Sequence, residues 1–250
     1  MLEIKNLSKS FSNQTRAALS NINLTINSGD YCVIIGNNGS GKSTLLKLIA
    51  GEYDASSGEI LLNQKNITML PMHLRAAYIS SVAQDINKGT ISELTVSENI
   101  ILSEMRGRNA SYQFCKNLSD KICADIEHLG FAPHNIIDKK MSDLSGGQRQ
   151  VIASLMATNP VPELLLLDEH TSALDAKTRL SIMMSTNQLI CEKQITTLMV
   201  THNIHDAIKY GNRLIIMSYG EIIYDFNMAE KEKLTEQQIL EILNDAEEAI

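Results

Sequence analysis

The segment GNNGSGKST, residues 36 to 44, restricts the fold of this chain more than any other part of the sequence. It fits the pattern GxxxxGK[ST], and it lies between a short apolar run, DYCVII, and an apolar-periodic run, TLLKLIAG. A strand, a glycine-rich turn and a helix in this order surround phosphate oxygens with backbone N–H groups, and the helix N-terminus adds its positive dipole. A glycine-rich turn without a ligand is disfavoured, because strand, loop and helix all agree with the motif. The segment therefore predicts a nucleotide phosphate site.

The residues of this segment have distinct expected roles. The glycines allow the backbone to wrap around phosphate oxygens. Lys42 is expected to reach the β- and γ-phosphates, and the hydroxyl of Ser43 is expected to ligate Mg²⁺. The candidate nucleotide-binding residues here are Gly36, Asn37, Asn38, Gly39, Ser40, Gly41, Lys42, Ser43 and Thr44.

Short apolar runs rich in Ile, Val and Leu alternate with longer helical stretches along most of the chain. This alternation predicts an α/β fold with a mostly parallel core sheet. The first runs alternate polar and apolar residues with no helix between them, which indicates an antiparallel β subdomain. The expected strands are residues 2–7, 22–26, 30–36, 59–62, 77–82, 163–168, 196–201, 213–218 and 221–226.

The 250 residues are expected to form a single nucleotide-binding domain with an insertion and a tail. Residues 1–90 and 159–225 are the expected catalytic core. Residues 91–158 contain no convincing strand, so they are expected to form an inserted α-helical subdomain. Residues 226–250 carry apolar side chains at helical spacing, which favours a surface helix packed on the core over a partner-binding helix.

Composition and charge exclude several classes of protein. The net charge of -7 argues against a broad nucleic-acid-binding surface, which requires a basic patch. No apolar run approaches the roughly 20 residues that cross a bilayer, so a membrane role requires a partner. The first residues alternate between polar and apolar side chains, as in a strand, and do not resemble a secretory signal. The cysteines are scattered along the chain, so we expect reduced thiols in a cytosolic protein. These cysteines are Cys32, Cys115, Cys123 and Cys191.

Two carboxylates follow the most apolar run of the chain. Asp168 and Glu169 end LLLLDE, a strand expected to be buried on both faces, whose carboxyl end opens where α/β proteins bind ligands. Beside a phosphate-binding loop, Asp168 is the expected Mg²⁺-associated aspartate and Glu169 the expected water-polarising glutamate. Two exposed acids at the start of a loop are the alternative, which the phosphate-binding loop in the same chain disfavours.

A third motif, LSGGQRQ, stands at residues 144 to 150, directly before the helical run VIASLMA. Ser145 with Gly146 and Gly147 offers another helix N-terminus with close backbone approach, which is again an anion site. One phosphate chain does not need two such sites from one molecule. The motif therefore suggests a site for a nucleotide held by another copy of the chain.

In this order and spacing, GNNGSGKST, LSGGQRQ and LLLLDE resemble the ATP-binding cassette of ABC transporters, over essentially all of residues 1 to about 225. The resemblance implies a P-loop ATPase with ATP and Mg²⁺ as cofactors. By position, Phe11 matches the aromatic side chain that stacks on adenine, and Gln84 matches the glutamine that senses Mg²⁺ and the attacking water. His202 matches the histidine that contacts the γ-phosphate.

The resemblance also assigns residues to the partner subunit. Ser145, Gly146, Gly147 and Gln148 form the signature segment, and the loop that crosses to the partner contains Ser172, Ala173, Leu174 and Asp175. From the residues alone, a role in the nucleotide site is best supported for His202, which ends an apolar strand on the same sheet edge as Asp168. A lone Phe11 is more often a core residue, and a lone Gln84 a polar strand end. His205 is expected on the surface of the following helix.

The resemblance implies ATP hydrolysis by a head-to-tail homodimer that drives transport through separate permease chains. Glu169 deprotonates water, while Lys42, His202 and Mg²⁺ balance the charge as the terminal phosphate leaves. Residues 85–110 are the expected docking surface for the permease, which places the chain at the cytoplasmic face of the cell membrane.

Finer features, including DEHTSALDAKT, resemble an importer-type branch that accompanies a periplasmic binding protein and a permease, with some systems linked to tryptophan, tyrosine or related compounds. The alternative is an ABC ATPase that powers a non-transport membrane process, such as lipoprotein extraction or cell-division signalling. A nucleic-acid-linked ATPase is disfavoured by the acidic charge and by the single cassette.

His170 departs from the family pattern, in which proline usually follows the glutamate. It adds a backbone N–H and an imidazole, which is expected to titrate near neutral pH. Because Glu169 and His202 already supply the proton-handling residue and the γ-phosphate contact, a structural role is favoured over a catalytic role for His170.

Overall fold

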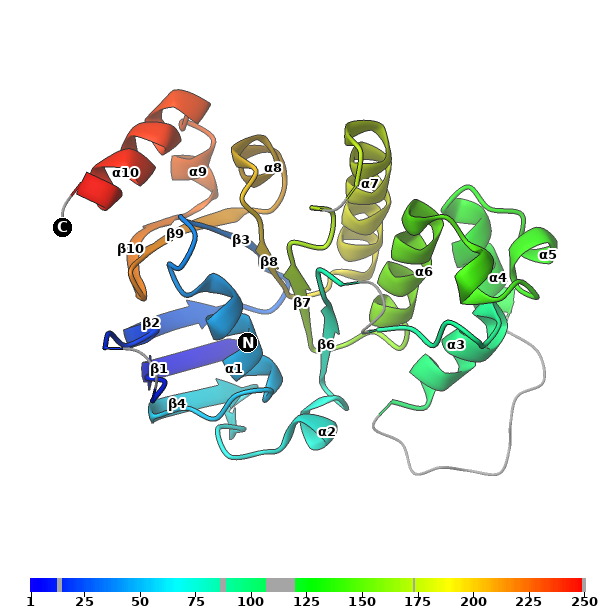
Figure 1. Ribbon diagram of the computed structural model, residues 1–250, viewed down its shortest axis with the longest axis horizontal. Helices are drawn as coiled ribbons and strands as arrows, with labels where there is room; N and C mark the ends of the chain where they lie inside the picture. The colour runs from blue at the N-terminus through cyan, green and yellow to red at the C-terminus, as the bar shows by residue number, and fades with distance from the viewer. Residues whose placement is uncertain (13–14, 86–88, 107–119, 173, 249–250) are drawn as a thin grey trace.

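The computed structural model describes residues 1–12, 15–85, 89–106, 120–172 and 174–248 (Figure 1). Its centre is a six-stranded sheet with strand order β10-β9-β3-β8-β7-β6. All of these strands run parallel except β10, which is antiparallel to β9. Strands β3 and β8 are buried at every residue, as expected where both faces of a sheet are covered. The strands are β3 (Tyr31–Ile35), β6 (Ile79–Val82), β7 (Leu164–Asp168), β8 (Thr197–Val200), β9 (Arg213–Ser218) and β10 (Glu221–Phe226).

A second, antiparallel sheet has strand order β2-β1-β4-β5. Helix α1 (Lys42–Ala50) shares one hydrophobic core with both sheets, since its Leu45 and Leu48 belong to the same cluster as Ile4 in β1 and Ile34 in β3. This packing fixes α1, and therefore fixes the loop that precedes it. The strands are β1 (Leu2–Lys9), β2 (Leu19–Ile26), β4 (Ser57–Leu62) and β5 (Lys65–Asn66).

Helices cover the other face of the six-stranded sheet (Figure 1). Met183 in α7, Ala207 in α8 and Ile239 in α10 pack into one cluster with residues of β3, β7 and β9. Ile239 is 0% exposed while its neighbour Leu240 is 48% exposed, so α10 is the amphipathic surface helix that the tail sequence predicts. The helices are α7 (Ala176–Lys193), α8 (Ile204–Lys209), α9 (Met228–Lys231) and α10 (Glu236–Glu248).

The helices between residues 96 and 158, here called the helical subdomain, lie on the side of the molecule away from the four-stranded sheet (Figure 1). They have a hydrophobic core of their own, which includes Val96, Ile126, Ile152 and Leu155. The helices are α3 (Val96–Glu104), α4 (Asp120–His128), α5 (Pro133–Ile136), the 3-10 helix η2 (Met141–Asp143) and α6 (Gly146–Thr158).

The structure confirms the α/β fold, the antiparallel sheet, the helical insertion and each expected strand. Strand β5 and the one-turn helix α2 (Met72–Arg75) were not predicted, because two to four residues are too few to show a period. Cys32, Cys123 and Cys191 are free thiols, and Cys115 lies outside the described residues. Within the described ranges, no helix is long and apolar enough to span a bilayer.

Candidate active site

The carboxyl ends of β3, β7 and β8 meet at one edge of the six-stranded sheet, and each is followed by candidate residues. The loop of residues 36–41 follows β3, Glu169 follows β7, and His202 lies two residues beyond β8. A cavity of ≈ 580 Å³ runs along the loop and is lined in part by Lys42 and Glu169. Glu169 also lines a second cavity, of ≈ 440 Å³, so this carboxylate connects the two spaces. The second cavity is lined by Asn38, Gln84, Glu169, Ser172 and His202.

The backbone conformation of the loop requires glycine at position 41. Gly41 has φ 97°, and a Cβ atom at this position would lie 2.6 Å from the carbonyl oxygen of Ala18. The buried Nζ of Lys42 donates hydrogen bonds to the carbonyl oxygens of Gly36 and Asn37, at 2.7 and 2.9 Å. The lysine therefore points into the loop, where phosphates bind in P-loop proteins.

The predicted metal ligands Ser43 and Asp168 lie in contact, because the Oγ of Ser43 donates to Oδ1 of Asp168 at 3.0 Å. Burial raises the pKa of Asp168, and the hydrogen bond from Ser43 opposes this effect. Burial lowers the pKa of Lys42, whereas the carboxylates of Glu169 and Asp168 raise it. The carboxylate of Asp168 is poorly solvated, so a bound cation would favour its ionised form.

Glu169 and His202 lie side by side, with 3.4 Å between Oε2 of the glutamate and Nδ1 of the histidine. Glu169 has φ 45°, in the left-handed region, and its backbone N–H donates to the carbonyl oxygen of Val200 at 3.0 Å. A strained backbone that a neighbouring strand holds in place is typical of functional sites. The structure thus brings together the carboxylate and the imidazole that the sequence placed on one sheet edge.

Gln84 joins this group from the end of β6. Its Nε2 donates to the Oγ of Ser172 at 3.2 Å, and the backbone N–H of Ser172 donates to the carbonyl oxygen of Glu169 at 3.0 Å. The amide of Gln84 is therefore held beside the turn that carries Glu169.

Two aromatic side chains also line the larger cavity, and the sequence predicted only one of them. Phe11, the predicted adenine-stacking residue, lines this cavity together with Arg16 and Tyr219, and the centre of the Tyr219 ring lies 4.5 Å from the guanidinium carbon of Arg16. Tyr219 stands in the turn between β9 and β10, which the backbone N–H of Gly220 ties to the carbonyl oxygen of Ser40 at 3.0 Å. The only sequence signal for Tyr219 was a Tyr-Gly turn between two apolar strands, and nothing in it indicated proximity to the loop.

The signature segment forms the N-terminus of α6. Ser145 is the N-cap: its Oγ accepts from the backbone N–H of Gln148 at 3.3 Å, and Oε1 of Gln148 accepts from the backbone N–H of Ser145 at 3.1 Å. A Cβ atom on Gly147 would lie 2.5 Å from Cγ2 of Thr178 in α7, so glycine allows the two helices to approach closely. Residues 145–148 line neither of the two cavities at the sheet edge.

The loop predicted to cross to a partner ends in a helix cap. Asp175 is the N-cap of α7, and its Oδ1 accepts from the backbone N–H groups of Lys177 and Thr178, both at 3.1 Å. The hydrogen bonds from Thr178 lower the pKa of Asp175. Ala173 lies outside the described residues.

His170 is 3% exposed, and its Nε2 has no hydrogen-bond partner in the described part of the chain. Burial lowers its pKa to about 4, so the expectation that it titrates near neutral pH is wrong. Its imidazole is neutral at pH 7 and lines neither cavity, which supports a structural role. His205, by contrast, is exposed on α8 as predicted and lies 3.2 Å from Glu236.

A phosphate-binding loop at a sheet edge and an acidic pair after a buried strand define a P-loop nucleotide hydrolase. Comparison with known proteins shows that the chain belongs to the ABC transporter family, whose family model matches residues 19–172. The chain is therefore an ATP-binding subunit of the ABC transporter type, and its reaction is ATP hydrolysis.

Two relatives illustrate the similarity. The chain is 42% identical to the tyrosine transport ATP-binding protein of Clostridioides difficile (strain R20291), over 96% of this chain and 98% of that protein. It is 34% identical to the phosphonates import ATP-binding protein PhnC of Shouchella clausii (strain KSM-K16), over 97% of this chain and 91% of that protein.

Solved structures agree with this assignment. The dimeric structure of MJ0796, a bacterial ABC transporter cassette, has a TM-score of 0.75 and 29% identity, and covers 91% of this chain and 99% of that one. A dimeric post-hydrolysis state of the same cassette, bound to ADP and Pi, has a TM-score of 0.73 and the same identity and coverage. Cassettes of this family therefore form dimers and bind adenine nucleotides.

Proposed function

We propose that the chain hydrolyses ATP as a head-to-tail homodimer. The observation that carries the proposal is the position of the signature segment, residues 145–148, which lines neither cavity at the sheet edge of its own chain. A helix N-terminus suited to an anion then serves a nucleotide held by a second copy. Each nucleotide lies between the phosphate-binding loop of one subunit and the signature segment of the other. The dimeric neighbour supports the formation of a dimer.

Glu169 is the general base in this proposal, because it lines both the phosphate cavity and the smaller cavity beside Gln84 and His202. The smaller cavity offers a place for the attacking water. Glu169 accepts a proton from that water, and Gln84 orients it. Lys42 and His202 balance the negative charge as the terminal phosphate leaves.

Ser43, Asp168 and Gln84 fit a Mg²⁺ site, because a hydroxyl, a carboxylate and an amide oxygen are the few hard ligands that this ion takes from a protein beside a phosphate chain. The contact between Ser43 and Asp168 at 3.0 Å supports this assignment. When bound, the ion neutralises charge on the β- and γ-phosphate oxygens.

Separate permease chains are the proposed partners, and they hold the cassette at the cytoplasmic face of the membrane. A groove of ≈ 320 Å³, lined mainly by β6, α3 and α6, lies partly within the predicted docking surface, residues 85–110. Ile91 and Leu102 line it and are 50% and 39% exposed, so they offer apolar surface to an inserted segment. Of the docking surface, residues 86–88 and 107–110 lie outside the described part of the chain.

Import is the proposed direction of transport, and an aromatic amino acid or a related compound is the proposed solute. Relatives named as import proteins for phosphonates and for spermidine/putrescine support the direction, and the relative named for tyrosine transport supports the solute class. Uptake of labelled tyrosine, compared with labelled spermidine, in cells that carry or lack this chain would separate these solute classes.

The homodimer is tested with Glu169→Gln. The amide cannot accept a proton, so turnover should fall by roughly 10²-fold or more while ATP is still bound. The variant should accumulate as a dimer in ATP, measured by analytical ultracentrifugation, and remain a monomer without nucleotide.

The control is Glu221→Gln, the same substitution at an exposed position of β10, which should leave turnover unaltered. Near-normal turnover of Glu169→Gln would rule out Glu169 as the base. A monomer of Glu169→Gln in saturating ATP would contradict the proposed dimer.

A further inference from the structure

Helix α6 connects two places with different proposed roles. Its N-terminus carries the signature segment, and its C-terminus ends at Asn159, about 20 Å away along a helix of 13 residues. Every residue from Gln150 to Thr158 is buried, so the helix moves only as a unit with what it contacts. The contacts at its C-terminal end therefore influence the position of Ser145 at the other end.

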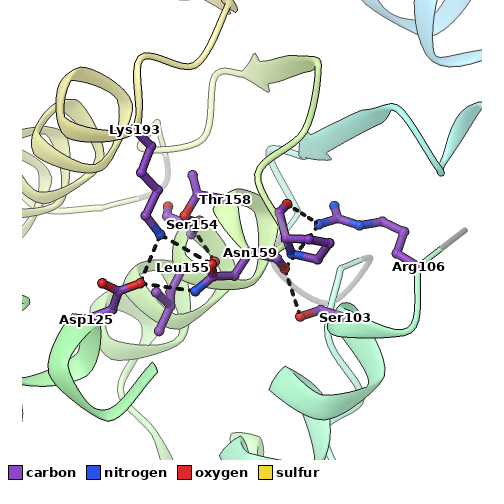
Figure 2. Close-up of polar contacts among 9 residues, drawn as sticks. Ser103, Arg106, Asp125, Ser154, Leu155, Thr158, Asn159 and Lys193 are labelled. Atoms are coloured by element: carbon purple, nitrogen blue, oxygen red, sulfur yellow. Dashed lines mark hydrogen bonds and ion pairs between the residues drawn. The ribbon is translucent and has the colours of Figure 1, made fainter. Parts of the chain in front are cut away.

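Arg106, just beyond the end of α3, binds that C-terminal end (Figure 2). Its Nη2 donates to the carbonyl oxygens of Met156 and Asn159, both at 3.2 Å, and of Pro160 at 3.3 Å. A cation is favourable here, because the last carbonyl groups of a helix lack partners within the helix and carry partial negative charge. Its Nη1 donates to the Oγ of Ser80 in β6, so one guanidinium joins the signature helix to the core sheet.

A second set of contacts holds the side chain of Asn159 from the opposite direction (Figure 2). Its Nδ2 donates to Oδ2 of Asp125 in α4 at 3.1 Å, and the same oxygen lies 2.9 Å from Nζ of Lys193 at the end of α7. These contacts involve α4 and α7 and none of the residues that line the groove between β6, α3 and α6. The end of α6 is thus fixed from two sides, and only the Arg106 side opens towards the groove.

Arg106 lines the groove that is proposed to receive the permease, as do Ser80 and Asp85. In the described part of the chain, every hydrogen bond of Arg106 goes to a neutral oxygen. Burial lowers the pKa of Arg106 without changing its charge near neutral pH. An acidic group that enters the groove offers this cation a stronger partner than a carbonyl oxygen, because a carboxylate carries a full negative charge and can accept two parallel hydrogen bonds from the guanidinium.

We propose that Arg106 is a positioning residue that ties the groove to the signature helix, so that an acidic group in the groove shifts α6 and with it Ser145. The inference rests on the proposed dimer, in which Ser145 meets the nucleotide of the other subunit. It predicts that Arg106 governs closure of the dimer and leaves ATP binding by the single chain unchanged.

The first test places Arg106→Ala and Arg106→Lys in the Glu169→Gln background, and measures ATP-dependent dimerisation and ATP affinity of the monomer. Dimerisation should weaken by roughly tenfold for alanine, the scale of a lost charged hydrogen bond, and by less for lysine, which keeps the charge but lacks the planar fork. ATP affinity should not change. Lys140→Ala is the control, since it removes one exposed cation from the same subdomain.

Equal dimerisation of Arg106→Ala and the control would overturn the inference alone. Failure of the Glu169→Gln parent to dimerise would overturn the proposed dimer and this inference with it. Thermal unfolding shows whether the alanine variant is folded. If it is not, the lysine variant decides, together with the comparison of anionic and cationic labels described next.

The second test fills the groove directly. Leu102→Cys is labelled with the anionic reagent 2-sulfonatoethyl methanethiosulfonate, in a protein whose Cys115, Cys123 and Cys191 are serine. The label should weaken ATP-dependent dimerisation several-fold when Arg106 is present and have little effect in Arg106→Ala. The cationic trimethylammonium reagent of the same length should have less effect, and a label at Met228→Cys, on α9, none.

An equal effect of the anionic label with and without Arg106 would show that the groove acts through another residue. Equal effects of the two reagents would show that bulk and not charge is responsible. Either result overturns the proposal.

Discussion

The two halves of the nucleotide site are built in different ways. The half that contains the phosphate-binding loop lies at the ends of three central strands, and its lysine is held by the loop itself. The signature half is one end of α6, fixed by close packing against α7 and by polar contacts at its far end. In the proposed dimer, the first half is contained in one chain, whereas the second half serves the nucleotide of a second copy. Changes in the first half should therefore affect binding by the single chain, and changes in the second half should affect dimer closure.

The largest effect is expected for Lys42→Ala. The change removes the cation expected to reach the phosphates and the two hydrogen bonds that hold the carbonyl groups of Gly36 and Asn37. ATP affinity of the monomer should fall by roughly 10²-fold, since each hydrogen bond to a charged group contributes about 1.5 to 3 kcal/mol. Isothermal titration calorimetry measures this, with the exposed Lys65→Ala as control. Unchanged ATP affinity would contradict the assignment of the loop.

An intermediate effect is expected for Gly147→Ala. The new methyl group would lie 2.5 Å from Cγ2 of Thr178, so α6 must shift away from α7, at a cost of about 1–3 kcal/mol in the free energy of unfolding. Dimerisation of the Glu169→Gln protein should weaken by roughly tenfold, a loss of about 1.4 kcal/mol, while ATP affinity of the monomer is retained. Ultracentrifugation and calorimetry measure the two quantities.

Two further variants sharpen this test. Thr178→Ser removes the clashing methyl group, so it should restore both stability and dimerisation to Gly147→Ala. Gly146→Ala should change the free energy of unfolding little, because its Cβ would meet only Leu174, at 3.7 Å. If Thr178→Ser does not rescue Gly147→Ala, close packing of α6 on α7 is not what positions the signature segment.

The half built on strands could be predicted from the sequence, and the reason is burial. A central parallel strand is covered on both faces, so β7 appears as the run LLLL, and the carboxylates that end it must lie at the sheet edge. The same argument predicts that His202 lies on the same sheet edge as Asp168. Strand β5 was not predicted, because its two residues form a strand only through their pairing with β4 and have no sequence pattern of their own.

The other half could be predicted only as a motif. LSGGQRQ indicated a helix N-terminus, but the ties that hold the helix come from residues far apart in sequence, such as Arg106 and Lys193. Tyr219 was missed for the same reason, since its place in the cavity depends on a turn that folds back onto the loop. Contacts of this kind have no local period or composition, so sequence patterns do not reveal them.

The smallest effect on ATPase activity at neutral pH is expected for a substitution of His170, which directly follows Glu169 in the sequence. The pKa of His170 is about 4 in the folded chain, whereas the ordinary value for histidine is 6.5. Between pH 4 and 6.5, His170 therefore binds a proton in the unfolded chain and not in the folded chain. Stability therefore falls as pH falls from 6.5 towards 4, by about 2 kcal/mol at pH 5, and this loss is absent at pH 7.

His170→Pro removes the titrating group, and no hydrogen bond donated by the backbone N–H of His170 is present among the described residues. Urea unfolding at pH 7 and pH 5 should show a smaller loss of stability on acidification for His170→Pro than for the parent. His205→Gln, which removes an exposed imidazole, should leave the loss unchanged. ATPase activity at pH 7 should survive the proline, because a buried imidazole that lines neither cavity does not reach the nucleotide or the attacking water. Loss of activity with the fold intact would instead place His170 in the chemistry.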